Sequence, residues 1–328
     1  MNFGWRGLAA IQKFQEARRW LRLHLFKQTW LADQFSRPES QEEMLLDVAR
    51  CSAYREALHR TVKPGDVVVD MGAGTGLLSF FAAEAGARQV YAIEMGIIAD
   101  VAAKLIEANG FEGRITLIRD NSTKVKLPEL CDLLVTETLS SFCFDDENMV
   151  AYLADARRRF LKPGARIIPA ACDTVLMPFS SDEFGPGLLP ERFYGLDYRV
   201  FRERRFAEAY GVATWGKRYT SLGSPVPYAR MSFYETTEMP GAASLVFAIC
   251  VEGRLDGFLG WFDCRLCDGV VLSNGPQLPP THWVQLCFPV MGQPHVRPGD
   301  TVTLHLDPHM IAGEAQWKYR VELSSTRT

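Results

Sequence analysis

The stretch VVVDMGAGTGLLSFFAAEAGARQVYAIEM, from Val67 to Met95, determines the fold class. A short run of valines leads into three glycines, an apolar helical pattern follows, and a second β-rich run ends beside Glu94. This order of strand, glycine loop, helix and strand is typical of Rossmann-like sheets that bind a nucleotide-like cofactor. Glycine at the turn permits positive φ and lets the backbone approach a ligand closely.

The spacing of the glycines and the acid before them indicate which cofactor this is. Gly72, Gly74 and Gly76 are spaced G-x-G-x-G, whereas dinucleotide sites use G-x-G-x-x-G. Asp70 just before them disfavours an anion and favours a cationic group such as an α-ammonium. Glu94, at the end of the next strand, can accept both hydroxyls of a ribose. Together these residues predict S-adenosylmethionine, with S-adenosylhomocysteine as product; NAD and a purely structural turn are the alternatives.

Strand and helix patterns alternate through about residue 178, which predicts a parallel, doubly wound sheet. A helix is predicted over 40–60, with Ser40 and Glu43 as its capping box. From residue 222 onward, short β-rich runs separated by Gly, Pro and Asp predict an antiparallel β domain.

We expect three segments, residues 1–38, 39–178 and 179–328. The first has apolar residues at helical spacing with basic residues between them, so an amphipathic helix is expected. That helix could pack on the domain, cover the active site, join an oligomer or, more weakly, lie on a membrane surface. The second segment is the cofactor domain and the third is the β domain. Residues 180–220 are rich in aromatic and basic residues and have little strand pattern.

Composition excludes several classes of protein. The net charge of −3 gives no global attraction to a nucleic acid, and no apolar run is long enough for a membrane span. We therefore expect a cytoplasmic, soluble protein without nucleic-acid or membrane partners. Of the eight cysteines, Cys264 and Cys267 form a C-x-x-C, but no second pair stands at zinc spacing, so no metal site is expected.

Polar residues follow two further strands of the predicted sheet. Asp120, Asn121 and Ser122 follow one strand, where the adenine would lie, although such residues are also ordinary turn formers. Glu137 ends another strand and Glu147 lies ten residues later. Two such carboxylates could bracket a guanidinium with bidentate hydrogen bonds and free a nitrogen lone pair for attack on a methyl group. Alternatively, Glu147 is an acid that favours the start of a helix.

Three more stretches add a family resemblance. These are EEMLLDVARCSAYREAL before the glycine loop, RFYGLDY at 192–198, and Thr281-His282-Trp283 before a strand. Together with the glycine loop and the acid loop ending in ENM, they resemble the protein arginine methyltransferase family, in the family's order, from about residue 40 to the end. The resemblance implies a Rossmann-like domain that binds S-adenosylmethionine, followed by an antiparallel β-barrel with a helical dimerisation arm at about 180–220. It also implies a head-to-tail homodimer.

The resemblance further implies roles for individual residues. His282 would match the histidine of the family's Thr-His-Trp loop, held by a neighbouring acid, and would accept or relay a proton, although a structural histidine is the alternative. The remaining roles are packing on the adenosyl group (Met44), pairing with the cofactor carboxylate (Arg50), lining the methionine end (Asp70, Gly72, Gly74), holding the ribose (Glu94) and supplying the two acids (Glu137, Glu147).

The chain departs from the family pattern in three places. The two acids lie one residue further apart than in the family, so that Asp146 occupies the strict position. The loop reads Thr-Leu-Ser-Ser in place of an aromatic Met-Gly-Tyr type of sequence, and the family's Tyr-Phe-x-x-Tyr helix is missing. The resemblance nevertheless leads us to expect methyl transfer to a guanidinium nitrogen of a protein or peptide. The alternative acceptor is a small molecule: free arginine, another amine or guanidine, or an indole carbon of a tryptophan-derived peptide. A non-catalytic protein that keeps the fold is a third interpretation.

Overall fold

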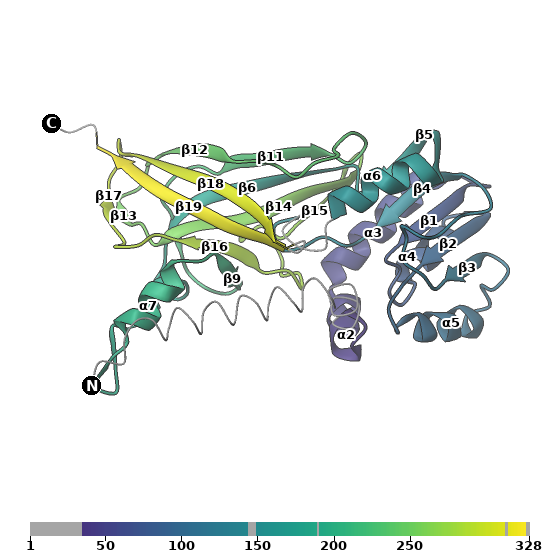
Figure 1. Ribbon diagram of the computed structural model, residues 1–328, viewed down its shortest axis with the longest axis horizontal. Helices are drawn as coiled ribbons and strands as arrows, with labels where there is room; N and C mark the ends of the chain where they lie inside the picture. Colours follow the sequence, from purple (N-terminus) through teal and green to yellow (C-terminus); the bar gives the residue numbers. More distant parts are fainter. Residues whose placement is uncertain (1–34, 144–148, 189, 312–313, 326–328) are drawn as a thin grey trace.

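The computed structural model describes residues 35–143, 149–188, 190–311 and 314–325. The molecule is elongated, with an α/β part at one end and a β part at the other (Figure 1). The amphipathic helix predicted for the N-terminal segment and the predicted acid Glu147 both lie outside the described residues. No helix in the described part of the chain has both the length and the apolar character needed to cross a membrane.

The α/β part is built on a parallel sheet, which confirms the predicted fold class. Its strands are β1 (Val67–Met71), β2 (Gln89–Ile93), β3 (Ile115–Ile118), β4 (Cys131–Thr136) and β5 (Leu161–Ile168), in the order β3-β2-β1-β4-β5. The helices α4 (Leu77–Glu84), α5 (Ala99–Ala108) and α6 (Met149–Phe160) connect them. Every residue of β1 is buried, as expected of a central strand covered on both faces. The strand order reverses between β1 and β4, so a ligand crevice is expected at their carboxyl ends.

The single helix predicted over 40–60 is wrong. The chain forms α2 (Pro38–Leu46) and α3 (Val48–Thr61), separated at Asp47. The Asp47 carboxylate accepts a hydrogen bond from the Arg50 backbone N–H at 2.9 Å and so caps α3, a position that aspartate favours. The predicted capping box is also wrong, because α2 begins with Pro38 and its N-cap, Arg37, makes no side-chain capping bond.

The β part consists of antiparallel sheets, as its sequence predicts. The seven-stranded sheet contains β6 (Ala171–Ser180), β9 (Tyr210–Val212), β10 (Thr220–Ser221), β11 (Val226–Ser232), β14 (Gly257–Cys267), β15 (Val270–Ser273) and β16 (Gln285–Pro289). The three-stranded sheet contains β12 (Ala243–Ala248), β18 (Thr301–Ile311) and β19 (Glu314–Ser324). The pair β13 (Gly253–Arg254) and β17 (His295–Val296) completes this part.

The predicted barrel is not confirmed, because no pairing among the described strands closes one sheet on itself. The two larger sheets instead share one core. Phe258 on β14 and Phe288 on β16 are buried together with Phe247 on β12 and Val302 on β18. Burial of apolar side chains between the sheets therefore holds them together where backbone pairing does not.

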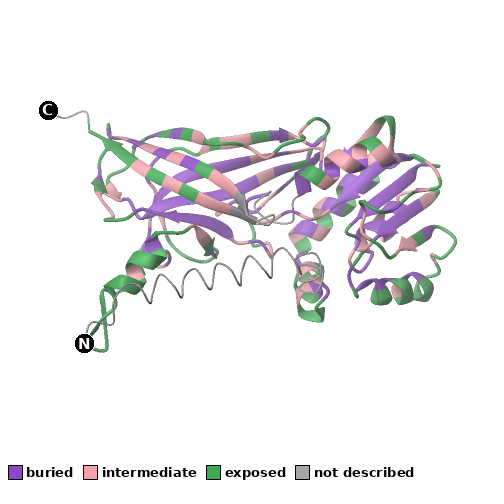
Figure 2. Ribbon diagram, in the orientation of Figure 1, coloured by how far each residue is buried: buried purple, intermediate pink, exposed green. Residues whose placement is uncertain are grey.

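The segment between β6 and β9 projects from the β part (Figure 1). It contains a short 3-10 helix (Pro186–Leu188), the hairpin of β7 (Arg192–Phe193) and β8 (Leu196–Asp197), and the helix α7 (Arg199–Phe206). Most of this segment is exposed (Figure 2), including the apolar side chains of Val200 and Phe201 and the 92% exposed Tyr194.

The two parts of the molecule meet through α3. Tyr54 and Leu58 on this helix are buried in the same core as Phe262 and Leu266 on β14. The helix that follows Asp47 therefore packs against both the parallel sheet and the β part. This places the start of α3, with Arg50, at the junction.

Candidate active site

The glycine loop after β1 is closely approached from two sides. Gly72 and Gly74 have φ of +73° and +55°. A Cβ added to Gly72 would lie 3.0 Å from Cγ2 of Thr138, and one added to Gly74 would lie 3.2 Å from Oε1 of Gln41. Glycine is therefore required here both for its conformation and for its size. The loop lies between α2 and the segment that follows β4.

Asp70 lies near the end of β1 and is completely buried. Its Oδ2 accepts a hydrogen bond from the Ser79 hydroxyl at 2.6 Å, whereas its Oδ1 is buried without a hydrogen-bond partner among the described residues. Burial raises the pKa of Asp70 to about 7; the Ser79 bond opposes this rise and the Glu94 charge adds to it. A buried carboxylate oxygen without a donor suits a cationic group.

Glu94 is fixed across the glycine loop. Its Oε2 accepts from the Gly74 backbone N–H at 2.9 Å and its Oε1 from the Gly96 backbone N–H at 2.6 Å. A carboxylate offers about four acceptor sites. Glu94 can therefore keep these two bonds and still accept the two hydroxyls of a ribose.

The polar residues after β3 form a local turn. The Asp120 carboxylate accepts from the Asn121 backbone N–H at 2.7 Å, and the Asn121 side chain accepts from the Thr123 backbone N–H at 2.9 Å. The Ser122 carbonyl accepts from the Arg159 guanidinium at 2.7 Å. These contacts are those of an ordinary polar turn, which is the alternative interpretation of these residues. Their role in binding adenine stays a prediction.

Arg50 and Glu137 form a buried ion pair. Nη1 of Arg50 lies 2.5 Å from Oε2 of Glu137, and the two side chains are only 8% and 6% exposed. Nη2 of Arg50 donates to the Met44 carbonyl at 2.9 Å. Burial lowers the pKa of Arg50, but the charge of Glu137 together with smaller contributions from Cys51, Tyr54 and Asp47 outweighs it, and the net pKa lies above the ordinary value. The guanidinium has five N–H donors, and its Nε is buried without a partner among the described residues, so it can bind a further acceptor.

His282 is held by Asp47. Nδ1 and the backbone N of His282 lie 2.8 and 2.9 Å from the same carboxylate oxygen, Oδ2. Burial raises the pKa of Asp47, but the bonds from the His282 side chain and from the backbone N–H groups of Arg50 and His282 together outweigh it, and the net pKa is lowered. An Asp47 carboxylate that accepts from Nδ1 leaves Nε2 of His282 as the acceptor nitrogen.

Sequence reasoning expected an acid beside His282 but did not identify Asp47. The available signal was the LLDVAR stretch, in which an aspartate before an apolar run is typical of a helix N-cap. That signal was hidden because residues 40–60 read as one continuous helix.

The structure brings the predicted residues together as two adjacent groups. One group lies at the glycine loop and contains Asp70, Gly72, Gly74 and Glu94. The other lies around the start of α3 and contains Met44, Arg50, Glu137 and His282. The groups adjoin because Thr138, next to Glu137, contacts Gly72. The third set of predicted residues, Asp120, Asn121 and Ser122, lies beside the segment that follows β2. The Asn121 amide nitrogen is 4.0 Å from Sδ of Met95 in that segment.

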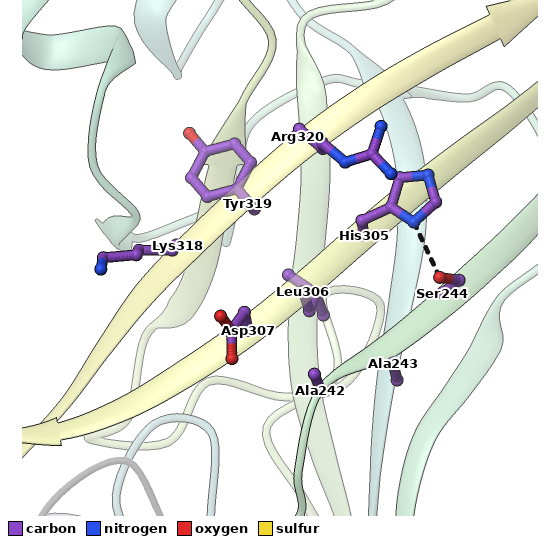
Figure 3. Close-up of a pocket in the computed structure, with 9 residues that line it drawn as sticks. All are labelled: Ala242, Ala243, Ser244, His305, Leu306, Asp307, Lys318, Tyr319 and Arg320. Carbon is purple, nitrogen blue, oxygen red and sulfur yellow. Dashed lines mark hydrogen bonds between the residues drawn. The ribbon is translucent and has the colours of Figure 1, made fainter.

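A separate open hollow lies on the three-stranded sheet (Figure 3). It is lined by residues of β12, β18 and β19, among them His305, whose Nδ1 lies 2.7 Å from the Ser244 hydroxyl, and the charged Lys318 and Arg320. None of its residues comes from the parallel sheet, so it is distinct from the candidate active site.

Comparisons with known proteins connect this geometry to a family. Residues 54–170 match the family model described as Ribosomal protein L11 methyltransferase (PrmA). The chain is 34% identical, over 296 residues, to the probable histone-arginine methyltransferase CARM1 of Oryza sativa, covering 84% of this chain and 55% of that protein. It is 28% identical to the probable protein arginine N-methyltransferase 6 of Arabidopsis thaliana, covering 74% and 66% of the two chains.

Solved structures show the same relationship. The Trypanosoma brucei PRMT1 enzyme–prozyme heterotetrameric complex with AdoHcy has a TM-score of 0.80 at 22% identity, covering 90% of this chain and 96% of that one, which shows a shared fold. Protein arginine methyltransferase 10 of Arabidopsis thaliana, in an open conformation, has a TM-score of 0.76 at 25% identity, covering 89% and 95%.

The chain spans about half the length of the curated relatives that it matches first, with 55% of the rice protein covered. Within that span the similarity includes both the parallel sheet and the β part, since the matched structures cover about nine tenths of this chain. The chain belongs to the protein arginine methyltransferase family.

Proposed function

We propose that the chain is an S-adenosylmethionine-dependent methyltransferase that methylates a guanidinium nitrogen of arginine in a protein or peptide. The observation that carries the proposal is the meeting of the Arg50–Glu137 ion pair and the Asp47–His282 pair at the start of α3, beside the glycine loop. Family membership supports the same reaction class.

The chain's residues fit the cofactor. Asp70 Oδ1 and Arg50 Nε are buried without hydrogen-bond partners among the described residues. They are complementary to the α-ammonium and the α-carboxylate of an amino acid, while Glu94 has acceptor sites left for a ribose. When bound, S-adenosylmethionine supplies an electrophilic methyl group on a sulfonium. The Trypanosoma brucei PRMT1 complex, which contains AdoHcy, agrees with this choice of cofactor.

On the acceptor side, Glu137 would orient a guanidinium. Its Oε2 already pairs with the Arg50 guanidinium, and among the described residues its Oε1 accepts one hydrogen bond, from the Leu139 backbone N–H at 3.3 Å. A substrate guanidinium that donates to Glu137 would have its charge localised away from the attacking nitrogen. His282, oriented by Asp47, would take the proton that this nitrogen releases. Glu147, the predicted second acid, would complete the clamp.

A methyl-transfer assay with isotopically labelled S-adenosylmethionine tests the proposal. One set of reactions contains an arginine-rich peptide; the other contains free arginine, other guanidines, amines and a tryptophan-containing peptide. Mass spectrometry with fragmentation locates the label. Label on an arginine side chain, lost in Glu137→Gln and kept in the exposed control Glu107→Gln, supports the proposal. Label only on a small molecule would instead establish the alternative acceptor class.

The proposal includes a homodimer. The projecting segment exposes Tyr194 and Phe201, and the α/β part exposes Leu46, Val48 and Ile97. Exposed apolar groups of this kind mark interaction surfaces. We propose that the projecting segment is a dimerisation arm, and that it packs on the α/β part of a second copy in a head-to-tail arrangement.

Three sequence expectations also remain proposals. The first is the β-barrel, which the shared core of the two antiparallel sheets supports. The second is the division at about residue 178; β6 already pairs with the antiparallel sheet from Ala171 onward, which favours a slightly earlier boundary. The third is a cytoplasmic location.

A further inference from the structure

Asn274 is a buried polar residue that the proposed reaction does not use. It directly follows β15, is 2% exposed, and its side chain makes three hydrogen bonds. Oδ1 accepts from the Phe262 backbone N–H at 2.8 Å, and Nδ2 donates to the carbonyls of Ser141 and Val284, both at 2.9 Å. One amide therefore uses both of its N–H groups and its oxygen on three separate segments.

Two of those segments carry the proposed reacting groups. Ser141 lies in the segment that begins with Glu137, and Val284 follows the Thr-His-Trp loop that contains His282. The two N–H groups of Asn274 hold these segments a fixed distance apart. Its Oδ1 bond to β14 anchors both segments to the long central strand of the seven-stranded sheet.

Asn274 is itself firmly placed. Its backbone carbonyl accepts from Nε2 of Gln285 at 2.6 Å, and Oε1 of Gln285 accepts from the Thr214 hydroxyl at 2.7 Å. Gln285 and Thr214 are buried as well. A buried, fully hydrogen-bonded network of this kind fixes one arrangement of the groups that it joins.

The segment after Glu137 relies on such backbone bonds. Thr138, Ser140 and Ser141 have small side chains. The segment is held by the Asn274 bond to the Ser141 carbonyl and by a 2.7 Å bond from the Trp283 indole to the Leu139 carbonyl. Both bonds come from the side of the molecule that carries His282.

We propose that Asn274 is a positioning residue that sets the placement of Glu137 relative to His282. The inference rests on the proposed methyl-transfer function of that site. Losing the two N–H donors would leave the carbonyls of Ser141 and Val284 without this partner, so that the two segments would move apart. Catalysis that depends on placement is sensitive to shifts of this size. Cofactor binding also uses Asp70 and Glu94, which are held by Ser79 and by the Gly74 and Gly96 N–H groups, and so should change less.

The test compares Asn274→Asp with Ser181→Ala, which also removes a buried hydrogen bond, from the Ser181 hydroxyl to the Arg218 carbonyl, but lies outside the Asn274 network. S-adenosylhomocysteine binding is measured by calorimetry, and kcat on an arginine-rich peptide is normalised to the enzyme that binds. We expect about a tenfold loss of kcat in Asn274→Asp, with the Kd for S-adenosylhomocysteine changed less than about twofold. Ser181→Ala should keep kcat within about twofold. Equal kcat in the two variants would overturn the proposal.

A pH profile separates positioning from a general structural effect. The introduced carboxylate has no proton to donate to the two carbonyls, but it regains one donor when protonated, and burial favours that form. The ratio of kcat in Asn274→Asp to kcat in the wild type should therefore rise as the pH falls. A flat ratio would count against the proposal, because a merely loosened fold would not recover on acidification.

Hydrogen exchange provides a readout that needs no acceptor. In Asn274→Ala, backbone amides in the peptide spanning 137–143 should exchange at least about tenfold faster than in Ser181→Ala. Equal exchange in the two variants would overturn the proposal even if kcat changed. If the wild type binds S-adenosylhomocysteine but methylates no acceptor, the proposed function fails, and the exchange result still decides whether Asn274 holds the segment.

Discussion

Replacing Asp70 with asparagine should weaken cofactor binding and stabilise the fold at the same time. The substitution is nearly isosteric and keeps an oxygen to accept the 2.6 Å bond from Ser79, so it removes little more than the charge. The wild-type carboxyl is fully buried, and its pKa is raised to about 7, by burial first and then by the Glu94 and Glu137 charges against the Ser79 bond. Near neutral pH the protonated and ionised forms of Asp70 are therefore both present, and a cationic ligand group binds the ionised form.

The size of the binding effect follows from that pKa. With a pKa of about 7 the carboxyl is roughly nine tenths ionised at about pH 8 and roughly one tenth ionised at about pH 6. A ligand that binds through an α-ammonium selects the ionised form, so its apparent affinity is reduced by the fraction of protein in that form. We expect the Kd for S-adenosylhomocysteine to rise about tenfold between about pH 8 and about pH 6.

The stability effect has the opposite sign. The folded-state pKa of about 7 lies above the ordinary value of 3.8, so the folded protein holds a proton that the unfolded chain has already released. Stability therefore falls as the pH rises from about 4 to about 7, and the full cost is present above about pH 7. At roughly 1.4 kcal/mol per tenfold change in proton affinity, the upper bound is about 4 kcal/mol. Asp70→Asn should regain part of this at about pH 8.

Calorimetric titration with S-adenosylhomocysteine at the two pH values, together with denaturant unfolding, measures both effects. Asp70→Asn should bind weakly with little pH dependence and unfold at higher denaturant concentration. The control is Asp132→Asn. Asp132 is the second residue of β4, and its carboxylate accepts a hydrogen bond from the Val67 N–H at the opposite end of the sheet. This variant should therefore keep the wild-type pH dependence. Wild-type affinity that does not change with pH, or dependence that persists in Asp70→Asn, would refute the reasoning.

Three further predictions concern other parts of the molecule. Asp47→Asn keeps a good N-cap, so the free energy of unfolding should fall by no more than about 1 kcal/mol. The rate of methyl transfer should fall about a hundredfold, because His282 loses the carboxylate that orients its ring. Equal rates in the variant and the wild type would exclude His282 from the proton path. Phe142→Ala empties a buried site that Trp317 contacts edge-on; chemical denaturation should show a loss of about 3–5 kcal/mol, and under about 1 would contradict the packing. Phe201→Arg on the exposed arm should give monomers in sedimentation velocity, with unchanged thermal unfolding; a persistent dimer would exclude the arm contact.

The parallel sheet could be predicted because its signals are local. Valine-rich runs, the glycine loop and the apolar helix that follows are contiguous in the chain, and the structure has β1 and β2 within a residue or two of their expected ends. The position of Asp70 and Glu94 beside the glycine loop could be predicted for the same reason, since each stands near a strand end. Position in a parallel sheet fixes where such residues meet.

The pairing of Asp47 with His282 could not be predicted in this way. The two residues are 235 positions apart in the chain, and no local pattern around residue 47 indicates that pairing. Asn274 presents the same difficulty, because Ser-Asn-Gly-Pro reads as an ordinary turn, while two of the groups that the Asn274 side chain binds are the carbonyls of Ser141 and Val284. Long-range polar contacts of single side chains are the part of the site that sequence periodicity does not contain.

The pattern of satisfied and unsatisfied buried charges distinguishes between the cofactors considered. Glu137 pairs with Arg50, and Asp47 accepts hydrogen bonds from His282, so both carboxylates at the junction have partners within the chain. Among the described residues of the candidate site, two buried atoms of charged side chains have no hydrogen-bond partner, the acceptor Oδ1 of Asp70 and the donor Nε of Arg50. A pyrophosphate would bring negative charge to Asp70 and leave that acceptor unpaired, at a cost of several kcal/mol. An amino-acid end brings a donor to Asp70 and an acceptor to Arg50, and so compensates both atoms at once. The buried polar atoms therefore favour S-adenosylmethionine over a dinucleotide, independently of the glycine spacing.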